Sequence, residues 1–399
     1  MTEPLHRADP SPPPRPPVVV APKPPGADYG YVEQQQAHAS TREELVLRLA
    51  EGRPTQLVWT PETEGIVPSW TVPYLFDAYR VHGVRHARKV AVVWGIVAAL
   101  SLGWAAALGT FDFRNGFVLF GFIAAVVSFY SALEWGRYRR LSPDRLTYQV
   151  REARARPPAR GGPARYTQVL AGAIGAVVLV QSLAAIFLHG SFPIMPGSAG
   201  NNASVAAAGM VAEWVRHGEP WRLLSSAFMH DGLLHFGMNV MALLALGRFM
   251  EAYSHRAYVP IVFLLTALAA STASYLHVDA SVGASGGIMG MFGFLAMMAR
   301  RRREVMPPGF GKAILIDIGV IAAMGFFGRG YIDNWAHAGG FVAGALLGWL
   351  MIPRPLQRTA YWEPSRPIRR LGDAALVILL LASLGTVAIL VARLFFGTA

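Results

Sequence analysis

Residues 283–299 open with Gly283-Ala284-Ser285-Gly286-Gly287 and continue as an apolar run. A run of this length with few charges is typical of a helix that crosses a lipid bilayer. A polar serine is uncommon inside such a helix unless it has a task. The glycines around it would allow a neighbouring helix backbone to approach closely. The stretch therefore predicts a tightly packed membrane helix that carries a functional hydroxyl group.

Further apolar runs lie on both sides of this stretch, and they indicate the fold class. Nine runs are long enough to span a bilayer of about 30 Å. They cover residues 90–110, 116–134, 167–188, 232–252, 258–277, 283–299, 312–328, 333–352 and 373–397. Hydrophobic residues make up 53% of the chain and charged residues only 15%, which is less charge than soluble proteins usually carry. The sequence therefore predicts an all-α polytopic membrane protein.

Basic residues gather in alternate gaps between these runs. They lie before the first run, between the second and third, near the junction of the fourth and fifth, after the sixth and after the eighth. Because basic loops stay on the cytoplasmic side, this pattern predicts a cytoplasmic N-terminus and an extracytoplasmic C-terminus. The net charge of +12 could also suggest nucleic acid, but its placement in loops favours membrane orientation and no nucleic-acid partner.

The amino-acid composition also bears on the compartment. The chain has no cysteine, which excludes disulfides, thiol catalysis and cysteine-ligated metals. A cysteine-free chain rich in arginine and alanine is typical of bacteria. We therefore expect a multi-pass protein of the inner (cytoplasmic) membrane, with a eukaryotic organelle left open as an alternative.

The predicted orientation brings polar residues of three helices to a similar depth. Ser285 lies at the start of its run, and His337 lies at the start of the run 333–352. His235 and Asn239 lie at the start of the run 232–252. All three starts face the outer side in this topology, so a composite site is expected there.

A serine and a histidine in this arrangement point to nucleophilic catalysis. Serine is a weak nucleophile that needs an adjacent base, and imidazole titrates near neutral pH. We predict Ser285 as the nucleophile and His337 as the general base. Their helices would have to pack unusually closely, and small residues on both helices would allow this. The glycines expected at this contact are Gly283, Gly286, Gly340 and Gly344.

Other polar residues near the predicted site have alternative roles. His235 and Asn239 share one helical face, and they could stabilise an oxyanion or simply hydrogen-bond across helices. Asp333 could orient the His337 ring as a third triad member, but an interfacial residue at the helix start, favoured by the helix dipole, is the preferred interpretation. A metal site of His230, His235 and His337 lacks the usual ligand spacing and carboxylates, so no metal and no cofactor are expected.

Taken together, these motifs resemble those of the rhomboid family of intramembrane serine proteases. Gly283-Ala284-Ser285-Gly286 is similar to the family's GxSG, and the segment from Ala336 to Gly344 is similar to AHxxGxxxG. The segment from His235 to Asn239 is similar to HxxxN. Trp221-Arg222 and His230 are similar to a WR pair and a further histidine of a long loop. The resemblance covers roughly residues 167–352, and four motifs in this order are far more specific than GxSG alone.

The resemblance implies a six-helix rhomboid-like core and a Ser-His dyad without an obligatory acid. His235, Asn239 and the Ser285 backbone amide would form the oxyanion hole, and Trp221 and Arg222 would shape a loop lying partly in the outer leaflet. Substrates would be single-pass transmembrane proteins, cut in or near their transmembrane helix in the lipid bilayer. The helix 312–328 and the loop through Gly330 would move aside to admit them.

The flanks depart from a six-helix pattern. Two extra transmembrane helices precede the core and one follows it, and the extra N-terminal pair could dock on the core, recruit substrate or restrict its admission. A short helix over 40–52, capped by Ser40 with Glu43, and a strand at Leu57–Trp59 are expected near the N-terminus. The predicted parts are a disordered Pro-rich tail 1–27, a small cytoplasmic region 28–89, a helix pair 90–134, a basic loop 135–166, the core 167–352, a basic loop 353–372 and a C-terminal helix 373–399.

Two other classes of function compete with an intramembrane endopeptidase. A catalytically silent relative that binds membrane clients would usually lack the serine or the histidine, yet both are present here. A transporter or channel would use polar residues along a path and would show internal repeats or paired broken helices. Neither feature is visible in the sequence, and the polar residues cluster on one side.

Overall fold

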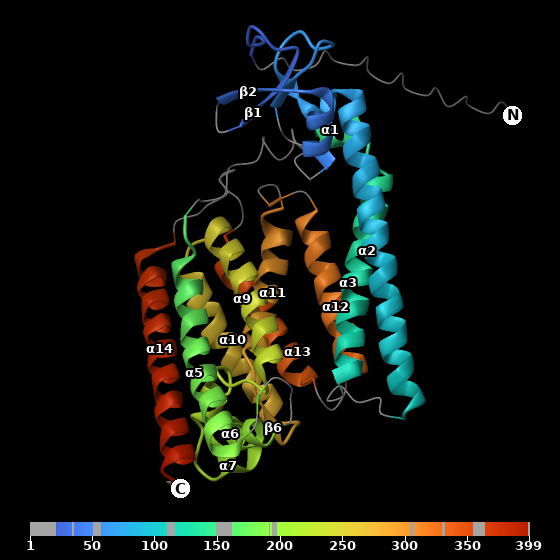
Figure 1. Ribbon diagram of the computed structural model, residues 1–399. Helices are drawn as coiled ribbons and strands as arrows, with labels where there is room; N and C mark the ends of the chain where they lie inside the picture. The colour runs from blue at the N-terminus through green and yellow to red at the C-terminus, as the bar shows by residue number, and fades with distance from the viewer. Residues whose placement is uncertain are drawn as a thin grey trace, which may run out of the picture. The chain divides into compact units, whose positions relative to one another are not determined.

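The structure, a computed structural model, describes residues 21–33, 36–50, 57–109, 116–148, 162–190, 192–193, 198–303, 306–307, 309–328, 332–353 and 364–397. The chain forms two compact units, one of residues 1–97 and 124–151 and one of residues 98–123 and 152–399. Figure 1 shows their helices and strands, and each unit is treated separately below.

The first unit begins with a small antiparallel sheet. Its strands are β1 (Tyr29–Glu33), β2 (Gln36–Ser40), β3 (Leu57–Trp59) and β4 (Val67–Pro68), in the order β2-β1-β3-β4. The strand predicted at Leu57–Trp59 is confirmed. Helix α1 (Arg42–Ala50) contributes the buried side chains of Leu45 and Leu49 to the apolar cluster beside this sheet.

The N-terminal cap of α1 differs by one residue from the prediction. Thr41 Oγ1 accepts the hydrogen bond from the Glu44 backbone N–H at 3.2 Å, and Ser40 Oγ donates to the Glu44 carboxylate at 2.8 Å. Both Ser40-x-x-Glu43 and Thr41-x-x-Glu44 fit the capping pattern, so the prediction of Ser40 with Glu43 was wrong by one position.

The expected tail 1–27 is described only from Ala21 onward. The Ile66 backbone N–H donates to the Ala21 carbonyl at 2.8 Å, and the Trp59 indole donates to the Ala27 carbonyl at 3.0 Å. The end of this segment is therefore held against the sheet, while residues 1–20 lie outside the described residues.

Each predicted apolar run corresponds to one long helix of the described chain. These helices are α2 (Pro73–Ala107), α3 (Gly116–Arg139), α5 (Arg165–His189), α9 (Leu233–Tyr253), α10 (Tyr258–Tyr275), α11 (Ser285–Arg301), α12 (Phe310–Phe327), α13 (Asn334–Met351) and α14 (Arg366–Phe395). Within the described residues, six of them are long and apolar enough to cross a membrane, namely α2, α5, α9, α10, α12 and α14. The chain is a mostly helical multi-span membrane protein.

Helix α2 starts well before the apolar run that predicted it. It begins at Pro73, where proline is favoured because the first turn has no use for its missing N–H, whereas the run begins near Val90. Hydropathy marks where a helix becomes apolar and does not mark where it starts. The predicted cytoplasmic region 28–89 therefore ends inside a helix.

The core of the second unit centres on α10, whose residues are largely buried. Helices α11 and α13 pack on α10 and on each other, and α14 runs beside α5 (Figure 1). Ser383 of α14 donates to the Ala173 carbonyl of α5 at 2.9 Å. The C-terminal helix is therefore an integral part of this unit.

The segment between α5 and α9 folds into short elements. They are α6 (Ala199–Ala208), β5 (Met210–Val211), α7 (Ala212–Arg216) and α8 (Arg222–Ser225). Strand β5 pairs with β6 (Ala280–Ser281), which ends two residues before Gly283. This pairing ties the long segment to the start of α11.

Helix α12 is packed more loosely than its neighbours. Ile314 and Gly325 are its buried residues among those described. Phe310 stacks on Phe249 of α9 with ring centroids 4.1 Å apart, and Asn334 donates to the Gly325 carbonyl at 2.9 Å. These contacts lie at the two ends of the helix, and Ile314, Ile318 and Ile321 between them pack on the apolar core of the unit.

The end of the N-terminal helix pair that belongs to the second unit contacts this unit's helices. We call residues 98–107 and 116–123 the hairpin tip. Phe122 lies 5.7 Å from Phe327 of α12 between ring centroids, and Leu234 of α9 packs in the apolar cluster of the tip. These contacts are those of the hairpin tip alone, and docking, substrate recruitment and restricted admission all stay predictions for the N-terminal pair.

Candidate functional site

Glycines bring the backbones of α11 and α13 into direct contact. A Cβ atom added to Gly340 would lie 2.1 Å from the Gly286 carbonyl oxygen, and one added to Gly344 would lie 1.9 Å from the Gly290 oxygen. Such distances are far below van der Waals contact, so larger residues do not fit without movement. The predicted close approach of these two helices is thus present in the geometry.

This contact places the starts of the two helices side by side. Ser285 is the first residue of α11, and His337 lies in the first turn of α13. A Cβ atom on Gly286 would lie 3.8 Å from the Ala336 carbonyl oxygen, so the neighbours of Ser285 and His337 touch. No hydrogen bond joins Ser285 Oγ to the His337 ring within the described residues. In free enzymes such bonds are often long and tighten only when substrate binds.

His235, in the first turn of α9, reaches the same place. Gly283 has φ of +130°, and a Cβ atom there would lie 2.9 Å from His235 Cε1, 3.0 Å from its Nε2 and 3.7 Å from Ser285 Oγ. The His235 imidazole and the Ser285 hydroxyl therefore lie beside the Cβ position of residue 283, which is empty only because that residue is glycine. His235 Nδ1 is buried without a hydrogen-bond partner among the described residues. An unsatisfied buried group of this kind is costly unless it serves a ligand or water.

Asn239 lies one turn further along α9 and is 7% exposed. Its amide nitrogen Nδ2 donates to the His235 carbonyl at 3.0 Å. Because an amide has two N–H donors, one remains for another acceptor. Asn239 both supports the helix turn that carries His235 and retains a donor.

His230 supports the loop that leads into Ser285. Gln181 of α5 exchanges two hydrogen bonds with the His230 backbone, at 3.1 and 3.2 Å. The Ala284 backbone N–H points to His230 Nε2 at 3.4 Å, and the His230 and His235 rings lie 5.1 Å apart. Burial lowers the pKa of His230 well below its usual value, so its ring is neutral and can accept this bond. Gln181 was missed, although it is a polar residue in an apolar run.

A small cavity adjoins the Ser285 hydroxyl. Its volume is about 10 Å³, close to the minimum that one water molecule needs. Ser226 and Ser271 contribute hydroxyl groups that lie 3.2 Å apart at its wall. These two serines could not be singled out from the sequence, because they come from different elements far apart in the chain.

The Trp221-Arg222 pair lies in a dense polar cluster. Arg222 is fully buried and donates to Glu219 at 2.5 Å, to the Gly209 carbonyl at 2.7 Å and to the Ala206 carbonyl at 2.9 Å. Arg393 of α14 donates to the other Glu219 oxygen at 2.6 Å and to the Ala207 carbonyl at 3.1 Å. These donors satisfy the carbonyls that the end of α6 leaves free.

Glu219 and Arg393 were missed by the sequence analysis. Arg393 is a charged residue near the end of an apolar run, and such residues usually have a polar partner inside the protein. The sequence alone did not identify Glu219 as that partner. The guanidinium groups of Arg222 and Arg393 also lie 4.9 and 5.5 Å from the Trp221 ring centroid. We call Glu219, Trp221, Arg222 and Arg393 the loop clamp.

Asp333 is the N-cap of α13. Its Oδ1 accepts from the Ala336 backbone N–H at 2.9 Å, and its Oδ2 accepts from the Ser274 hydroxyl. Both oxygens are thus used for structure. In the described part of the chain, no group of three or more His, Asp or Glu side chains is arranged to hold a metal ion.

Comparison with known proteins agrees with these motifs. Residues 217–354 match the family described as Rhomboid domain. The chain is 33% identical over 161 residues to RHOMBOID-like protein 2 of Arabidopsis thaliana, covering 39% of this chain and 49% of that protein. It is 31% identical over 150 residues to Rhomboid protease GluP of Bacillus subtilis (strain 168), covering 37% and 29%. It is also 31% identical over 153 residues to RHOMBOID-like protein 4 of Arabidopsis thaliana, covering 36% and 37%. The matched region thus spans less than half of each of these relatives.

Proposed function

We propose that this protein, whose residues 217–354 match the Rhomboid domain family, is an intramembrane serine endopeptidase that cleaves transmembrane helices of membrane-protein substrates. The observation that carries the proposal is the meeting of three helix starts. Ser285 Oγ and the His235 ring flank Gly283, and the residues beside Ser285 and His337 touch. A hydroxyl, a base and a further polar ring are the parts that acyl transfer needs.

In the proposed reaction, Ser285 Oγ attacks the carbonyl carbon of the scissile bond. His337 takes the hydroxyl proton as general base and then gives it to the leaving amine, so that the C–N bond breaks and an acyl-enzyme forms. Water then attacks the ester with His337 again as base. The cavity beside Ser285 is large enough to hold that water.

The developing oxyanion requires fixed donors. His235, Asn239 and the Ser285 backbone N–H are proposed for this role, because the His235 ring lies beside Ser285 Oγ and Asn239 lies one turn further along α9. Asn239 keeps one free amide hydrogen, and His235 Nε2 is the ring nitrogen that lies beside the Gly283 Cβ position. Removal of one such donor typically costs about 10²–10³-fold in rate.

Single-pass transmembrane proteins are the proposed substrates, admitted beside α12. Among the described residues this helix has far fewer buried side chains than α10 or α11, so its displacement would break fewer contacts within the protein. Gly330, predicted to take part in this motion, lies outside the described residues. The proposal includes the nine-helix topology, with the N-terminus in the cytoplasm and the site towards the outer face of a bacterial inner membrane.

The test uses a single-pass transmembrane substrate reconstituted with the full chain. Wild type is expected to yield product, while Ser285→Ala and His337→Ala yield none, with unchanged thermal stability. Ser131→Ala in α3 and His189→Ala at the end of α5 are matched controls that should retain activity. A fluorophosphonate probe should label the wild type and not Ser285→Ala.

Each possible outcome is informative. Labelling or cleavage that persists in Ser285→Ala would remove this serine from the role of nucleophile. A folded wild type that neither cleaves several substrates nor reacts with the probe would favour a client-binding protein instead.

A further inference from the structure

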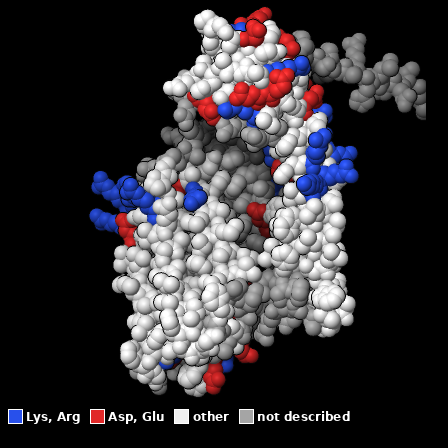
Figure 2. All heavy atoms as spheres, viewed as in Figure 1, with Lys and Arg blue, Asp and Glu red and all other residues white. Residues whose placement is uncertain are grey.

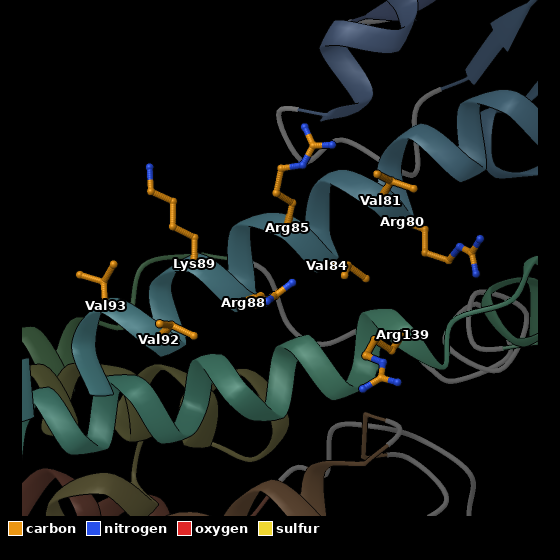
Figure 3. A pocket seen from close by; sticks show the side chains of 9 residues that line it. All are labelled: Arg80, Val81, Val84, Arg85, Arg88, Lys89, Val92, Val93 and Arg139. Carbon is orange, nitrogen blue, oxygen red and sulfur yellow. The ribbon is translucent and has the colours of Figure 1, made fainter. Parts of the chain in front are cut away.

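A groove on the first unit combines basic and apolar side chains. It has a volume of about 700 Å³ and is bordered by α2 and the end of α3 (Figure 3). Four valines line it, and no acidic residue does. Its basic side chains are Arg80, Arg85, Arg88, Lys89 and Arg139.

Carboxylates of the protein neutralise little of this charge. Arg80 pairs with Asp77 at 3.1 Å, and the nearby Glu134 is already paired with Arg137 at 2.9 Å. In the described part of the chain, no carboxylate lies within salt-bridge distance of the other four cations of the groove. Arg80 also has a buried Nε atom without a hydrogen-bond partner among described residues. The groove therefore offers donors and positive charge for an anion.

The Trp135 ring of α3 lies near two of these cations, one from each helix. The guanidinium groups of Arg88 from α2 and Arg139 from α3 lie 5.9 and 5.8 Å from the Trp135 ring centroid. Such contacts restrict the positions of guanidinium groups that would otherwise be free. The two helices thus present cations from both sides, which exposed arginines on a single loop would not do.

The apolar side of the groove follows the basic side along the same helix. Val92 and Val93 are about half exposed, and Ile96 continues this exposed face one turn later. Lys89 lies one turn before Val93, so charge and apolar surface are about 6 Å apart along the helix. In Figure 2 the blue atoms gather over the early part of α2 and give way to white surface along the helix. A basic surface followed by an apolar surface suits an amphiphile that has an anionic head group and an apolar tail.

We propose that this groove binds an anionic phospholipid. Its phosphate lies against Arg85, Arg88, Lys89 and Arg139, and part of an acyl chain lies along Val92 and Val93. Basic residues that only fix topology need to be near the membrane, but they need not converge on one groove. Arginine pairs phosphate oxygens with two N–H groups at once, and basic pockets between transmembrane helices suit lipid head groups.

The test measures lipid retention by the full-length protein in native mass spectrometry. Wild type is expected to retain phosphatidylglycerol and not phosphatidylcholine. The triple variant Arg85→Gln, Arg88→Gln, Lys89→Gln should bind phosphatidylglycerol at least tenfold more weakly. The matched control is Arg366→Gln, Arg369→Gln, Arg370→Gln at the start of α14, which removes equal charge from another exposed basic cluster and should change little.

A second variant tests the shape of the groove without changing its charge. Val84→Trp should fill the groove and weaken phosphatidylglycerol binding, while thermal unfolding confirms that the variant is folded. Glycerol 3-phosphate has the same head chemistry without acyl chains and should not displace the lipid. Equal losses in both triple variants, full retention in the groove variants, or displacement by glycerol 3-phosphate would each overturn the proposal.

Discussion

At the scale of single residues, the contact between α11 and α13 depends on the absence of side chains. Gly344 has no room for a Cβ atom, because the Gly290 carbonyl oxygen occupies that position at 1.9 Å. We predict that Gly344→Ala destabilises the protein by about 1–3 kcal/mol through overpacking, measured by thermal unfolding in detergent. Gly319→Ala in α12 is the control, since nothing lies within 4 Å of its Cβ position. If Gly344→Ala left the thermal stability unchanged, α11 and α13 would be able to move apart at little cost in free energy.

The oxyanion donors give a second prediction at this scale. Asn239→Ala should lower kcat by about 10²–10³-fold, because one donor is lost while His235 and the Ser285 backbone N–H remain. The KM for a reconstituted substrate should change little, since the oxyanion exists only during the reaction. A loss confined to KM would assign Asn239 to substrate binding or to support of the helix.

The residues at the site differ in how well the sequence could predict them. Ser285, His337 and His235 stand out because polar groups are rare in apolar runs. Gln181 carries the same signal, but its bonds to the His230 backbone depend on a loop whose path has no sequence signature. Ser226 and Ser271 become neighbours only through tertiary packing.

At the scale of elements, the C-terminal helix α14 does more than lengthen the bundle. Through Arg393 it joins the loop clamp and satisfies carbonyls at the end of α6. We predict that Arg393→Met lowers the free energy of unfolding by about 1–3 kcal/mol, the cost of leaving buried acceptors unpaired. Thermal unfolding in detergent would measure this, with Arg370→Met at the exposed start of α14 as the control. Equal stability of Arg393→Met and wild type would contradict the role of the clamp.

The loop clamp should also respond to acid. The hydrogen bond from Arg393 lowers the pKa of Glu219 below its usual value, so the charged form is favoured in the folded protein. Its contribution to stability is therefore present above the unfolded carboxyl pKa of about 4.5 and is lost as pH falls through the lower folded value. The stability difference between wild type and Glu219→Gln should accordingly be constant near neutral pH and shrink below pH 4.5. A difference that persists undiminished at low pH would be inconsistent with this.

The long helices were predictable because burial in a bilayer leaves a local hydropathy signal. The β5–β6 pair and the loop clamp were not, since each joins segments far apart in the sequence and uses ordinary residues. The start of α2 at Pro73 was missed for a related reason, because a helix can extend from the membrane into a polar segment without any break in the chain.

At the scale of the whole second unit, the hairpin tip contacts both α9 and α12. Leu234 directly precedes His235, and Phe327 ends the loosely held helix. If substrates are admitted beside α12, these contacts must break first. An aromatic pair is worth about 1 kcal/mol, so Phe122→Ala should raise the cleavage rate by roughly fivefold.

Phe129→Ala provides the matched control for this experiment. Phe129 lies on the same helix, is exposed and pairs with its neighbour Tyr130, so its loss should leave the rate unchanged. Initial rates on one reconstituted substrate would be compared. Slower cleavage by Phe122→Ala would indicate that the tip helps to guide substrates instead of restraining them.

The position of Ser285 has a consequence for the fate of the products. It is the first residue of a 17-residue helix, so the proposed chemistry takes place near one end of α11 and far from its middle. A polypeptide cut at that level is divided unequally. One product keeps nearly the whole hydrophobic segment and stays anchored, while the other carries only a few apolar residues and can diffuse away from the lipid. Such an enzyme would release the less hydrophobic product on one side of the membrane only. That side is the compartment that the Ser285 end of α11 faces.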